Sequence, residues 1–289
     1  MKVISRPLIL AILSVSMFNS PLRGGVLLSE ISGGGSSDWI EVMLAPGSEP
    51  MDISFLFVTM YYGTNEKLAD SPVTLYAEDR PATAWDDRFA VIRFVSSSQE
   101  DETDITGDIN GNGIRDIYCV NYGLWNTDCC VAIDSNDDPA DNGMLDFMAF
   151  SNRDGSINST IASYINYAIS HGMWQSCASP NLQDCCVFAG EEGMNSYSTI
   201  SRTGTADTGS ADNFILTPYA TPGRDNIIGN GSDRGRVIKS LKDPIVYDYD
   251  RAGNSGIMEL PLFLYSRASL RVRIFNASGM PVYCGPLLR

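Results

Sequence analysis

Short apolar runs separated by polar turns extend from residue 26 to residue 226. These runs are rich in β-branched and aromatic residues, which favours β-strands over helices. Glycine, asparagine and aspartate gather between the runs, as expected for turns. The runs that predict strands span residues 26–31, 38–42, 53–60, 73–76, 89–94, 131–133, 144–150 and 212–223. The pattern therefore predicts an all-β fold.

One helix is predicted to interrupt the strands. Apolar side chains recur at helical spacing over residues 160–171. Asn158 or Ser159 can cap the start of this helix, and Gly172 can end it. We expect the helix to lie across one edge of the β-structure, as part of an insertion.

The pattern changes after residue 226. Residues 227–243 are polar and contain several glycines, which predicts a linker. Within residues 244–289, extended stretches at 270–274 and 280–283 flank an Asn-Ala-Ser-Gly turn, which predicts a β-hairpin. We therefore expect a second, incomplete β module whose open sheet edges favour association.

The first 25 residues are predicted to be a signal peptide. Lys2 and Arg6 precede an apolar run over residues 7–18, which suits a signal-peptide core and is short for a membrane-spanning helix. No cysteine precedes Cys119, so the lipid-anchoring residue of a bacterial lipoprotein is missing. We expect a secreted or cell-surface protein with no membrane span after processing. The alternative is an uncleaved N-terminal anchor, because the cleavage site is poorly defined.

The charge balance limits the expected partners. The chain has 35 acidic and 20 basic residues, a formal net charge of -15. This charge repels phosphate backbones, and no block of Lys and Arg offsets it. We therefore expect no nucleic-acid partner.

Seven cysteines suit an exported, disulfide-bonded protein. Vicinal pairs occur at 129–130 and 185–186, and neighbouring Cα atoms lie about 3.8 Å apart, below the usual disulfide window, so each pair should bond outward. We expect Cys119 to bond one member of the first pair and Cys177 one member of the second. The remaining members are then available to pair with each other, and Cys284 stands alone. A zinc cluster is the alternative, although Cys-x2-Cys spacing is absent.

A calcium site is predicted in residues 104–116, whose sequence is Asp-Ile-Thr-Gly-Asp-Ile-Asn-Gly-Asn-Gly-Ile-Arg-Asp. Counted from Asp108, oxygen donors recur at every second position in a loop that bends at Gly113. That spacing suits a hard cation. The predicted ligands are Asp108, Asn110, Asn112, the carbonyl group of Ile114, and Asp116.

This loop departs from an EF-hand at its last ligand position, where Cys119 replaces the bidentate acid. A second acidic loop could supply the missing oxygens if a Cys119 disulfide holds it nearby; its donors are Asp134, Asn136, Asp137, Asp138 and Asp141. The alternative is a solvated turn, which Asp, Asn and Gly form without a metal. If Ca²⁺ binds, we expect a structural role, because the ion would order an acidic loop.

Little in the chain points to catalysis. His171 is the only histidine and ends the predicted helix, where histidine commonly interacts with terminal carbonyl groups. Nucleophile-elbow, phosphate-loop and zinc-protease motifs are absent from the sequence. We therefore predict no catalytic or cofactor-binding residues. The alternative is a secreted metal-dependent hydrolase that acts on glycans or phosphodiesters through paired acids, with Trp125 or Trp174 as a sugar platform.

Three motifs resemble those of the lamin-tail domain of secreted bacterial proteins. The opener has Leu-Leu-Ser-Glu at 27–30, a glycine-rich turn and Asp-Trp-Ile-Glu at 38–41. A strand at 146–150 reads Asp-Phe-Met-Ala-Phe, and the closer runs over 212–226. The resemblance implies an immunoglobulin-like β-sandwich over residues 26–226.

The expected hairpin near the C-terminus resembles the start of immunoglobulin-like modules of the flagellar-hook-capping and secretion-sorting types. Together with the predicted export, it favours a non-catalytic binding or scaffold protein. The expected partner is an extracellular protein or glycan.

Overall fold

The computed structural model describes residues 25–35, 38–61, 65–80, 83–121, 123–137, 143–196, 198–218, 220–226, 271–275 and 281–286. Its strands are β1 (Val26–Ser32), β2 (Trp39–Leu44), β3 (Met51–Asp52), β4 (Phe57–Met60), β5 (Asn65–Lys67), β6 (Thr74–Leu75), β7 (Phe89–Val95), β8 (Asp116–Val120), β9 (Asp128–Asp134), β10 (Met144–Ser151), β11 (Val187–Phe188), β12 (Thr199–Arg202), β13 (Phe214–Thr217), β14 (Arg271–Phe275) and β15 (Pro281–Pro286). Its helices are α1 (Ser159–Ser170) and the short 3₁₀ helices η1 (Leu182–Cys185) and η2 (Ala211–Asn213).

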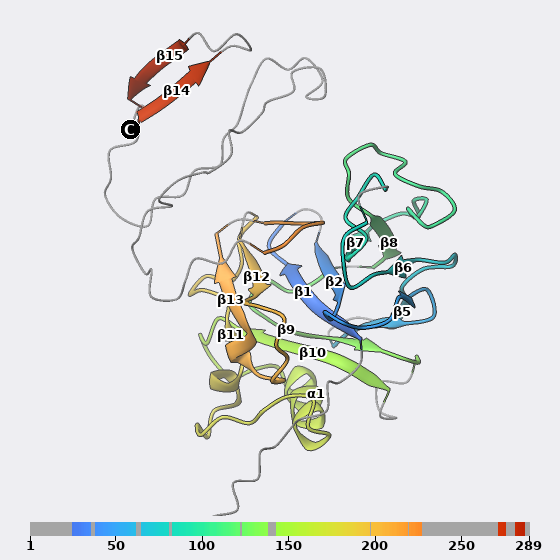
Figure 1. The fold of residues 1–289 in the computed structure, drawn as a ribbon. Coiled ribbons are helices and arrows are strands. Elements are labelled where there is room, and N and C mark those ends of the chain that lie inside the picture. Colours follow the sequence, from blue (N-terminus) through green and yellow to red (C-terminus); the bar gives the residue numbers. More distant parts are fainter. Residues whose placement is uncertain are drawn as a thin grey trace, which may run out of the picture.

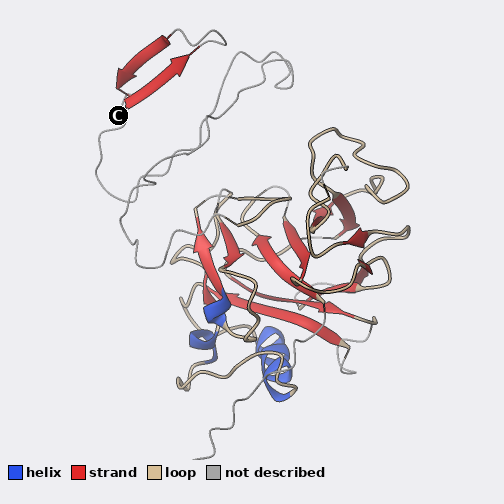
Figure 2. Ribbon diagram, viewed as in Figure 1, coloured by secondary structure: helices blue, strands red, loops and turns tan. Residues whose placement is uncertain are grey.

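Two sheets pack face to face around one hydrophobic core (Figures 1 and 2). The first sheet has six strands in the order β13-β12-β1-β2-β7-β8, and the second has five in the order β11-β10-β9-β4-β5. Neighbouring strands are antiparallel except for the parallel pairs β7–β8 and β10–β11. The all-β prediction is confirmed, with a sandwich of two sheets as its architecture.

One predicted strand is shorter than expected because a side chain closes a turn inside it. The apolar run at 53–60 forms a strand only over β4, from Phe57 onward. Before β4, the carboxylate of Asp52 accepts the amides of Ser54 and Val73, and the Leu56 amide donates to the Ile53 carbonyl. These bonds satisfy the backbone locally, so the first residues of the run do not join the sheet.

A bulge in β1 decides which of its side chains face the core. Val26 and Leu28 are core residues, and strict alternation would send Glu30 to the same face. The register of β1 against β2 shifts between Leu28 and Glu30, so one extra residue is inserted there. Ile31 therefore returns to the core, while Glu30 lies on the outer face, opposite Glu41 of β2.

A buried ion pair satisfies the backbone beside this bulge. The Leu28 amide donates to Asp146 Oδ2, and Arg202 Nε donates to the Leu28 carbonyl, each at 2.6 Å. Arg202 Nη2 lies 2.6 Å from Asp146 Oδ2, and the two side chains are 1% and 2% exposed. Because Asp146 belongs to β10 and Arg202 to β12, the pair also links the two sheets. Burial raises the pKa of Asp146 to about 6, against the effect of Arg202, so the carboxyl is ionised above that pH.

The segment of residues 221–226, which we call the strap, lies over the outer face of the six-stranded sheet. Asn226 Nδ2 donates to the carbonyl groups of Ser29 and Arg202, at 3.0 and 3.1 Å, where the bulge interrupts the pairing of β1 with β12. Gly223 has φ +74°, and a Cβ there would lie 3.1 Å from the Ile114 side chain. The strap therefore requires glycine at this position.

Helix α1 has the predicted extent and cap, but its position differs from the expected one. The Asn158 side chain accepts the Thr160 amide at the N-terminus, and Gly172 follows the last turn with φ +68°. The helix buries Ile161, Ile165 and Ala168, and it packs on β9, a central strand of the five-stranded sheet. It thus covers the outer face of this sheet rather than an edge, because its apolar side is broad enough to need a whole face.

Only one of the expected disulfides is present among the described cysteines. Cys177 and Cys185 are bonded, as predicted. The predicted bond from Cys119 to the 129–130 pair is wrong, since Cys119 lies on β8 and the pair on β9 of the other sheet, and all three are free and buried. Burial raises the pKa of Cys119 to about 12, so this thiol stays protonated.

The predicted cross-link between the remaining pair members is also wrong. Cys130 lies opposite Ala149 on β10, and Cys186 precedes β11 on the other side of β10; both are free. Two strand spacings separate Cα atoms by about 9.5 Å, beyond the disulfide limit of about 6.8 Å.

The C-terminal hairpin is visible as β14 paired antiparallel with β15, with Ile274 opposite Tyr283. The predicted signal peptide, apart from Gly25, and the predicted linker at 227–243 lie outside the described residues. No helix in the described part of the chain combines the length and hydrophobicity needed to cross a bilayer.

We predict that Arg202→Met lowers the free energy of unfolding by about 3–5 kcal/mol at neutral pH, because Asp146 is left as an uncompensated buried charge. The double variant Arg202→Met/Asp146→Asn should recover part of this loss, since it removes that charge. Urea denaturation of the two variants measures the difference. Equal losses in both would contradict an electrostatic role for the pair.

Removing the disulfide with Cys177→Ser/Cys185→Ser should cost about 2.5 kcal/mol, the chain-entropy estimate for a short closed loop. Reduced wild-type protein is the matched control and should lose the same amount in urea denaturation. An unchanged unfolding midpoint in the variant would show that packing alone holds this insertion.

Candidate metal centre

The predicted calcium loop belongs to the connection between β7 and β8, and carboxylates in this connection bind along the edge of β8. The amide of Asp116 donates to Glu102 Oε2 at 3.0 Å, and that of Tyr118 donates to Asp101 Oδ1 at 2.8 Å. The Glu102 amide in turn donates to the Asp116 carbonyl at 2.9 Å. Because side-chain oxygens occupy amides that another strand would use, β8 is protected as an edge strand.

The structure brings three of the five predicted ligands together through their side chains. Asn110 Nδ2 and Asn112 Nδ2 both donate to Asp116 Oδ2, each at 2.9 Å. Asp108 closes the turn from the other side, accepting the amides of Gly111 at 2.8 Å and Gly113 at 3.1 Å. The donors therefore converge on one small turn.

The fifth predicted ligand, Ile114, follows directly in this turn. Its amide donates to Asn112 Oδ1 at 2.7 Å, and the Asn112 amide donates to Asn110 Oδ1 at 2.9 Å. Each asparagine thus directs its oxygen to the backbone and its NH₂ group to Asp116. Rotation of the two terminal amides by half a turn would present their oxygens instead, which is the orientation that a cation requires.

The donor set suits a hard cation in chemistry but is poor in negative charge. Carboxylate, amide and carbonyl oxygens are the ligands that Ca²⁺ prefers. Among the predicted ligands, only Asp108 and Asp116 are acids, and Asp116 Oδ1 already lies 2.6 Å from Arg93 Nε. Within the described ranges, no group of three or more His, Cys, Asp or Glu residues is positioned to hold a metal ion. The turn therefore offers a cation oxygen donors but little negative charge.

Glu102 anchors the turn to β8. Its Oε1 atom accepts the amides of Ile109 at 2.8 Å and Asn110 at 3.0 Å, while Oε2 accepts that of Asp116. The side chain is 1% exposed, so these three bonds replace water. The start of the turn and its last ligand are consequently held by a single carboxylate.

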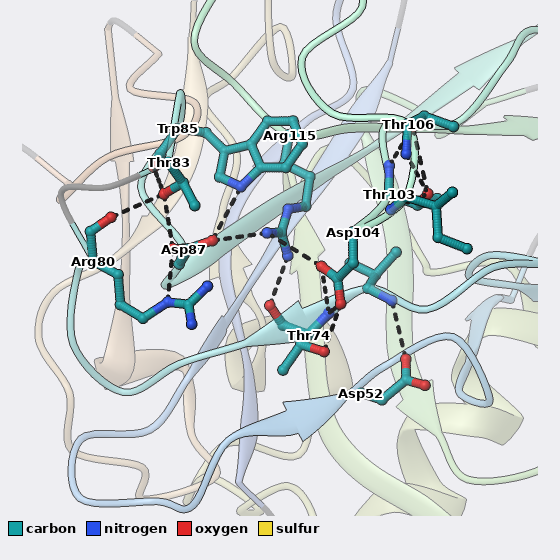
Figure 3. Close-up of polar contacts among 12 residues, drawn as sticks. Asp52, Thr74, Arg80, Thr83, Trp85, Asp87, Thr103, Asp104, Thr106 and Arg115 are labelled. Carbon is teal, nitrogen blue, oxygen red and sulfur yellow. Dashed lines mark hydrogen bonds and ion pairs between the residues drawn. The ribbon is translucent and has the colours of Figure 1, made fainter.

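A second network fastens the residue before Asp116 (Figure 3). Asp87, which is fully buried, accepts hydrogen bonds from Arg115 Nη2 at 2.8 Å, Trp85 Nε1 at 3.1 Å, Thr83 Oγ1 at 2.8 Å and Arg80 Nε at 3.1 Å. Four donors on one carboxylate leave none of its charge unpaired. The loop before β7 is thereby bonded to the end of the turn at residues 108–116.

Arg115 also reaches β6 and the start of the predicted site. Its Nη1 atom donates to the Thr74 carbonyl at 2.7 Å, and Nη2 lies 3.5 Å from Asp104 Oδ1 (Figure 3). Its Cζ atom lies 4.5 Å from the centroid of the Trp85 ring, whose face partly compensates Nε, a buried donor without a hydrogen-bond partner. Burial lowers the pKa of Arg115, opposed by Asp104 and Asp87.

Part of the second acidic loop lies within the described residues. Asp134 ends β9 in the five-stranded sheet and is fully buried, and its Oδ1 atom accepts the Asn136 amide at 3.2 Å. The disulfide that was to hold this loop beside residues 104–116 is absent, because Cys119 is free. Asp138 and Asp141 lie outside the described residues.

Two of the alternative catalytic or sugar-binding residues are in structural positions. His171 is the C-cap of α1, and its Nδ1 atom lies 3.0 Å from the Tyr167 carbonyl oxygen. Trp174 is 1% exposed, with its Nε1 donating to the Cys185 carbonyl, so it offers no platform to a sugar. Trp125 is 45% exposed and is the tryptophan that remains accessible in the described chain.

Sequence patterns alone did not predict Glu102 and Arg115, which hold the candidate site in place, or a buried acid pair, Glu30 and Glu41. A signal for the pair is present in the sequence, since each glutamate interrupts an apolar run that predicts a buried strand. Nothing local distinguishes Glu102 or Arg115 from other charged residues of a polar loop.

Comparisons with known proteins give no relative: no protein family, curated protein or solved structure significantly matches the chain.

We predict that Glu102→Ala speeds hydrogen exchange at the amides of Ile109 and Asn110 and costs about 1–3 kcal/mol of stability, because these amides and that of Asp116 lose their acceptor. Glu100→Ala is the matched control, since Glu100 is exposed in the same loop and should behave as wild type. Unchanged exchange in the Glu102 variant would show that the turn does not depend on this carboxylate.

Proposed function

We propose that the protein is an exported, non-catalytic binding or scaffold protein whose β-sandwich carries a structural calcium site. The observation that carries the calcium assignment is the convergence of the two asparagine amides on one oxygen of Asp116. Two N–H donors beside a carboxylate occupy the place that a cation would take, and the same side chains provide amide oxygens after rotation. The supporting network holds Asp116 ready for either partner.

A structural role for the ion follows from the position of the turn. The turn lies in the long β7–β8 connection, and its last ligand begins β8. Ordering such a connection costs conformational entropy, which a bound ion offsets in the folded state alone. Calcium would therefore stabilise the edge of the six-stranded sheet and the loop that covers it.

Membership of the lamin-tail family is part of this proposal. The opener and closer that carry the resemblance meet in space, although about 190 residues separate them in sequence. Glu30 and Glu41 of the opener accept hydrogen bonds from Thr221 and Gly223 of the closer. Joint folding of the two motifs supports the view that they are parts of one domain.

The proposed partner is an extracellular protein or glycan. Support comes from the predicted signal peptide, from the net charge of -15, which opposes nucleic acid, and from the exposed side chain of Trp125. An exposed indole ring stacks on sugar rings and on apolar protein surfaces.

Calcium titration tests the metal assignment. We expect a saturating excess of about 100 times the dissociation constant to stabilise the protein by about 2.7 kcal/mol, or a rise in melting temperature of about 5–10 °C. The shift should be lost with chelator and in Asp108→Asn, and it should persist in Asp70→Asn, whose side chain is 99% exposed.

The absence of any calcium shift in wild-type protein would remove the metal site and leave a hydrogen-bonded turn. Hydrolysis of glycans or phosphodiesters by metal-loaded protein, lost in Asp108→Asn, would replace the scaffold proposal with a hydrolase.

A further inference from the structure

Two glutamates lie side by side beneath the strap with no cation beside them. Glu30 and Glu41 are opposite residues on β1 and β2, and both side chains are fully buried. In the described part of the chain, neither glutamate forms an ion pair with a basic side chain. Arg88 pairs instead with Asp86 and Asp225. Cβ atoms of opposite residues in antiparallel strands lie about 4.5–5.5 Å apart. Two carboxylates on opposite residues and out of water repel each other, and, after burial, Glu30 accordingly raises the pKa of Glu41.

The two carboxyls have different hydrogen-bond environments. Glu30 accepts the hydroxyls of Thr199 at 2.6 Å and Ser201 at 3.0 Å, and the amide and hydroxyl of Thr221 at 2.9 and 3.1 Å. This set of donors stabilises a carboxylate. Glu41 Oε2 accepts the Gly223 amide at 2.6 Å, and its buried Oε1 atom has no hydrogen-bond partner. Burial and Glu30 raise the pKa of Glu41 by more than the Gly223 amide and the nearby Ser29 hydroxyl lower it. An oxygen without a donor costs less on a neutral carboxyl than on a carboxylate.

The charged groups around the pair do not neutralise a second negative charge. Asp86, from the loop before β7, raises the pKa of Glu41 further, after burial and Glu30. Arg202 of β12 is committed to Asp146 on the inner face of the sheet, and Arg224 of the strap is exposed. On the neighbouring strands β7 and β8, Arg93 is paired with Asp116.

We propose that the pair of Glu30 and Glu41 holds one proton, and that this proton fastens the strap to the six-stranded sheet. Glu30 is the ionised member, and Glu41 carries the proton. When the proton is lost at higher pH, two adjacent negative charges face the strap, and its opening readmits water to both. The device concerns the strap alone and does not depend on calcium binding.

The direction of the pH effect follows from the pKa shifts. Burial raises the pKa of both glutamates above about 4.3, the ordinary value for glutamate in an unfolded or opened chain. The state in which the strap covers the two glutamates is the closed state, and the state in which the strap has moved away is the open state. Above that pH, the closed state therefore binds more protons than the open state. Closure is strongest at acidic pH and weakens as the pH rises through the pKa of the closed pair.

Hydrogen exchange at the amides of Thr221 and Gly223 tests this inference, because both amides donate to the pair. In wild-type protein we expect their protection factors, corrected for intrinsic exchange, to fall by up to tenfold per pH unit as the pH rises from the ordinary pKa of glutamate to the raised pKa of the closed pair. In Glu41→Gln the fall should be shallower, because the amide accepts the Gly223 bond without titrating and only Glu30, whose pKa is also raised by burial, is left to lose a proton. Glu49→Gln, which removes one exposed charge, should follow wild type.

A second measurement keeps the test decisive if Glu41→Gln fails to fold. Infrared spectra of wild-type protein with carbon-13 label in its glutamate carboxyls should show a protonated carboxyl at pH 7. This label excludes buried aspartates such as Asp146. Protection factors that are flat in wild type, or a spectrum with only ionised glutamate, would overturn the proposal. A pH dependence in folded Glu41→Gln as steep as that of wild type would do the same, since the proton would then reside elsewhere.

Discussion

The bulge in β1 is the constraint on which the rest of the structure depends. At the bulge, the amide and carbonyl groups of Leu28 need hydrogen-bond partners. Asp146 of one sheet accepts from the amide, and Arg202 of the other sheet donates to the carbonyl. A buried ion pair gains little net stability over a well-packed apolar pair, but removal of one partner is costly. In this sandwich the pair both joins the two sheets and hydrogen-bonds the backbone at the bulge. Its loss would therefore disturb the sheet contact and the bulge.

The bulge has a second consequence on the outer face of the sheet. By inserting Ser29 it turns Glu30 outward, where Glu30 meets Glu41 and the hydroxyls of β12. The strap then covers this polar patch, and Asn226 closes the gap between β1 and β12. The first strand and the end of the described sandwich are therefore joined by hydrogen bonds, and buried acids replace the apolar contacts usual at such a position.

The β8 edge of the same sheet is held by a second group of carboxylates, which accept hydrogen bonds from amides and guanidinium groups. Glu102 and Asp101 accept amides along β8, and Asp87 gathers four donors around Arg115. These carboxylates act as acceptors for backbone or guanidinium groups, which consumes negative charge locally. Part of the acidic excess of the chain thus forms hydrogen bonds within the fold. These bonds also support the turn from Asp108 to Asp116.

Hydrophobic patterning predicted the all-β class and helix α1, capping preferences offered Asn158 or Ser159 as its cap, and cysteine spacing predicted a bond from Cys177 to Cys185 or Cys186. Each of these features depends on residues close in sequence. The predicted ligands of one turn also came together for this reason, since positions 108–116 follow one another along a single loop. Local spacing could not reveal that Cys119 and the 129–130 pair belong to different sheets. Nor could it place Glu30 opposite Glu41, or Arg202 against Asp146, because these meetings require the bulge and the stacking of strands far apart in the chain. Side chains whose partners are remote acquire their chemistry from packing, and packing is a property of the assembled fold.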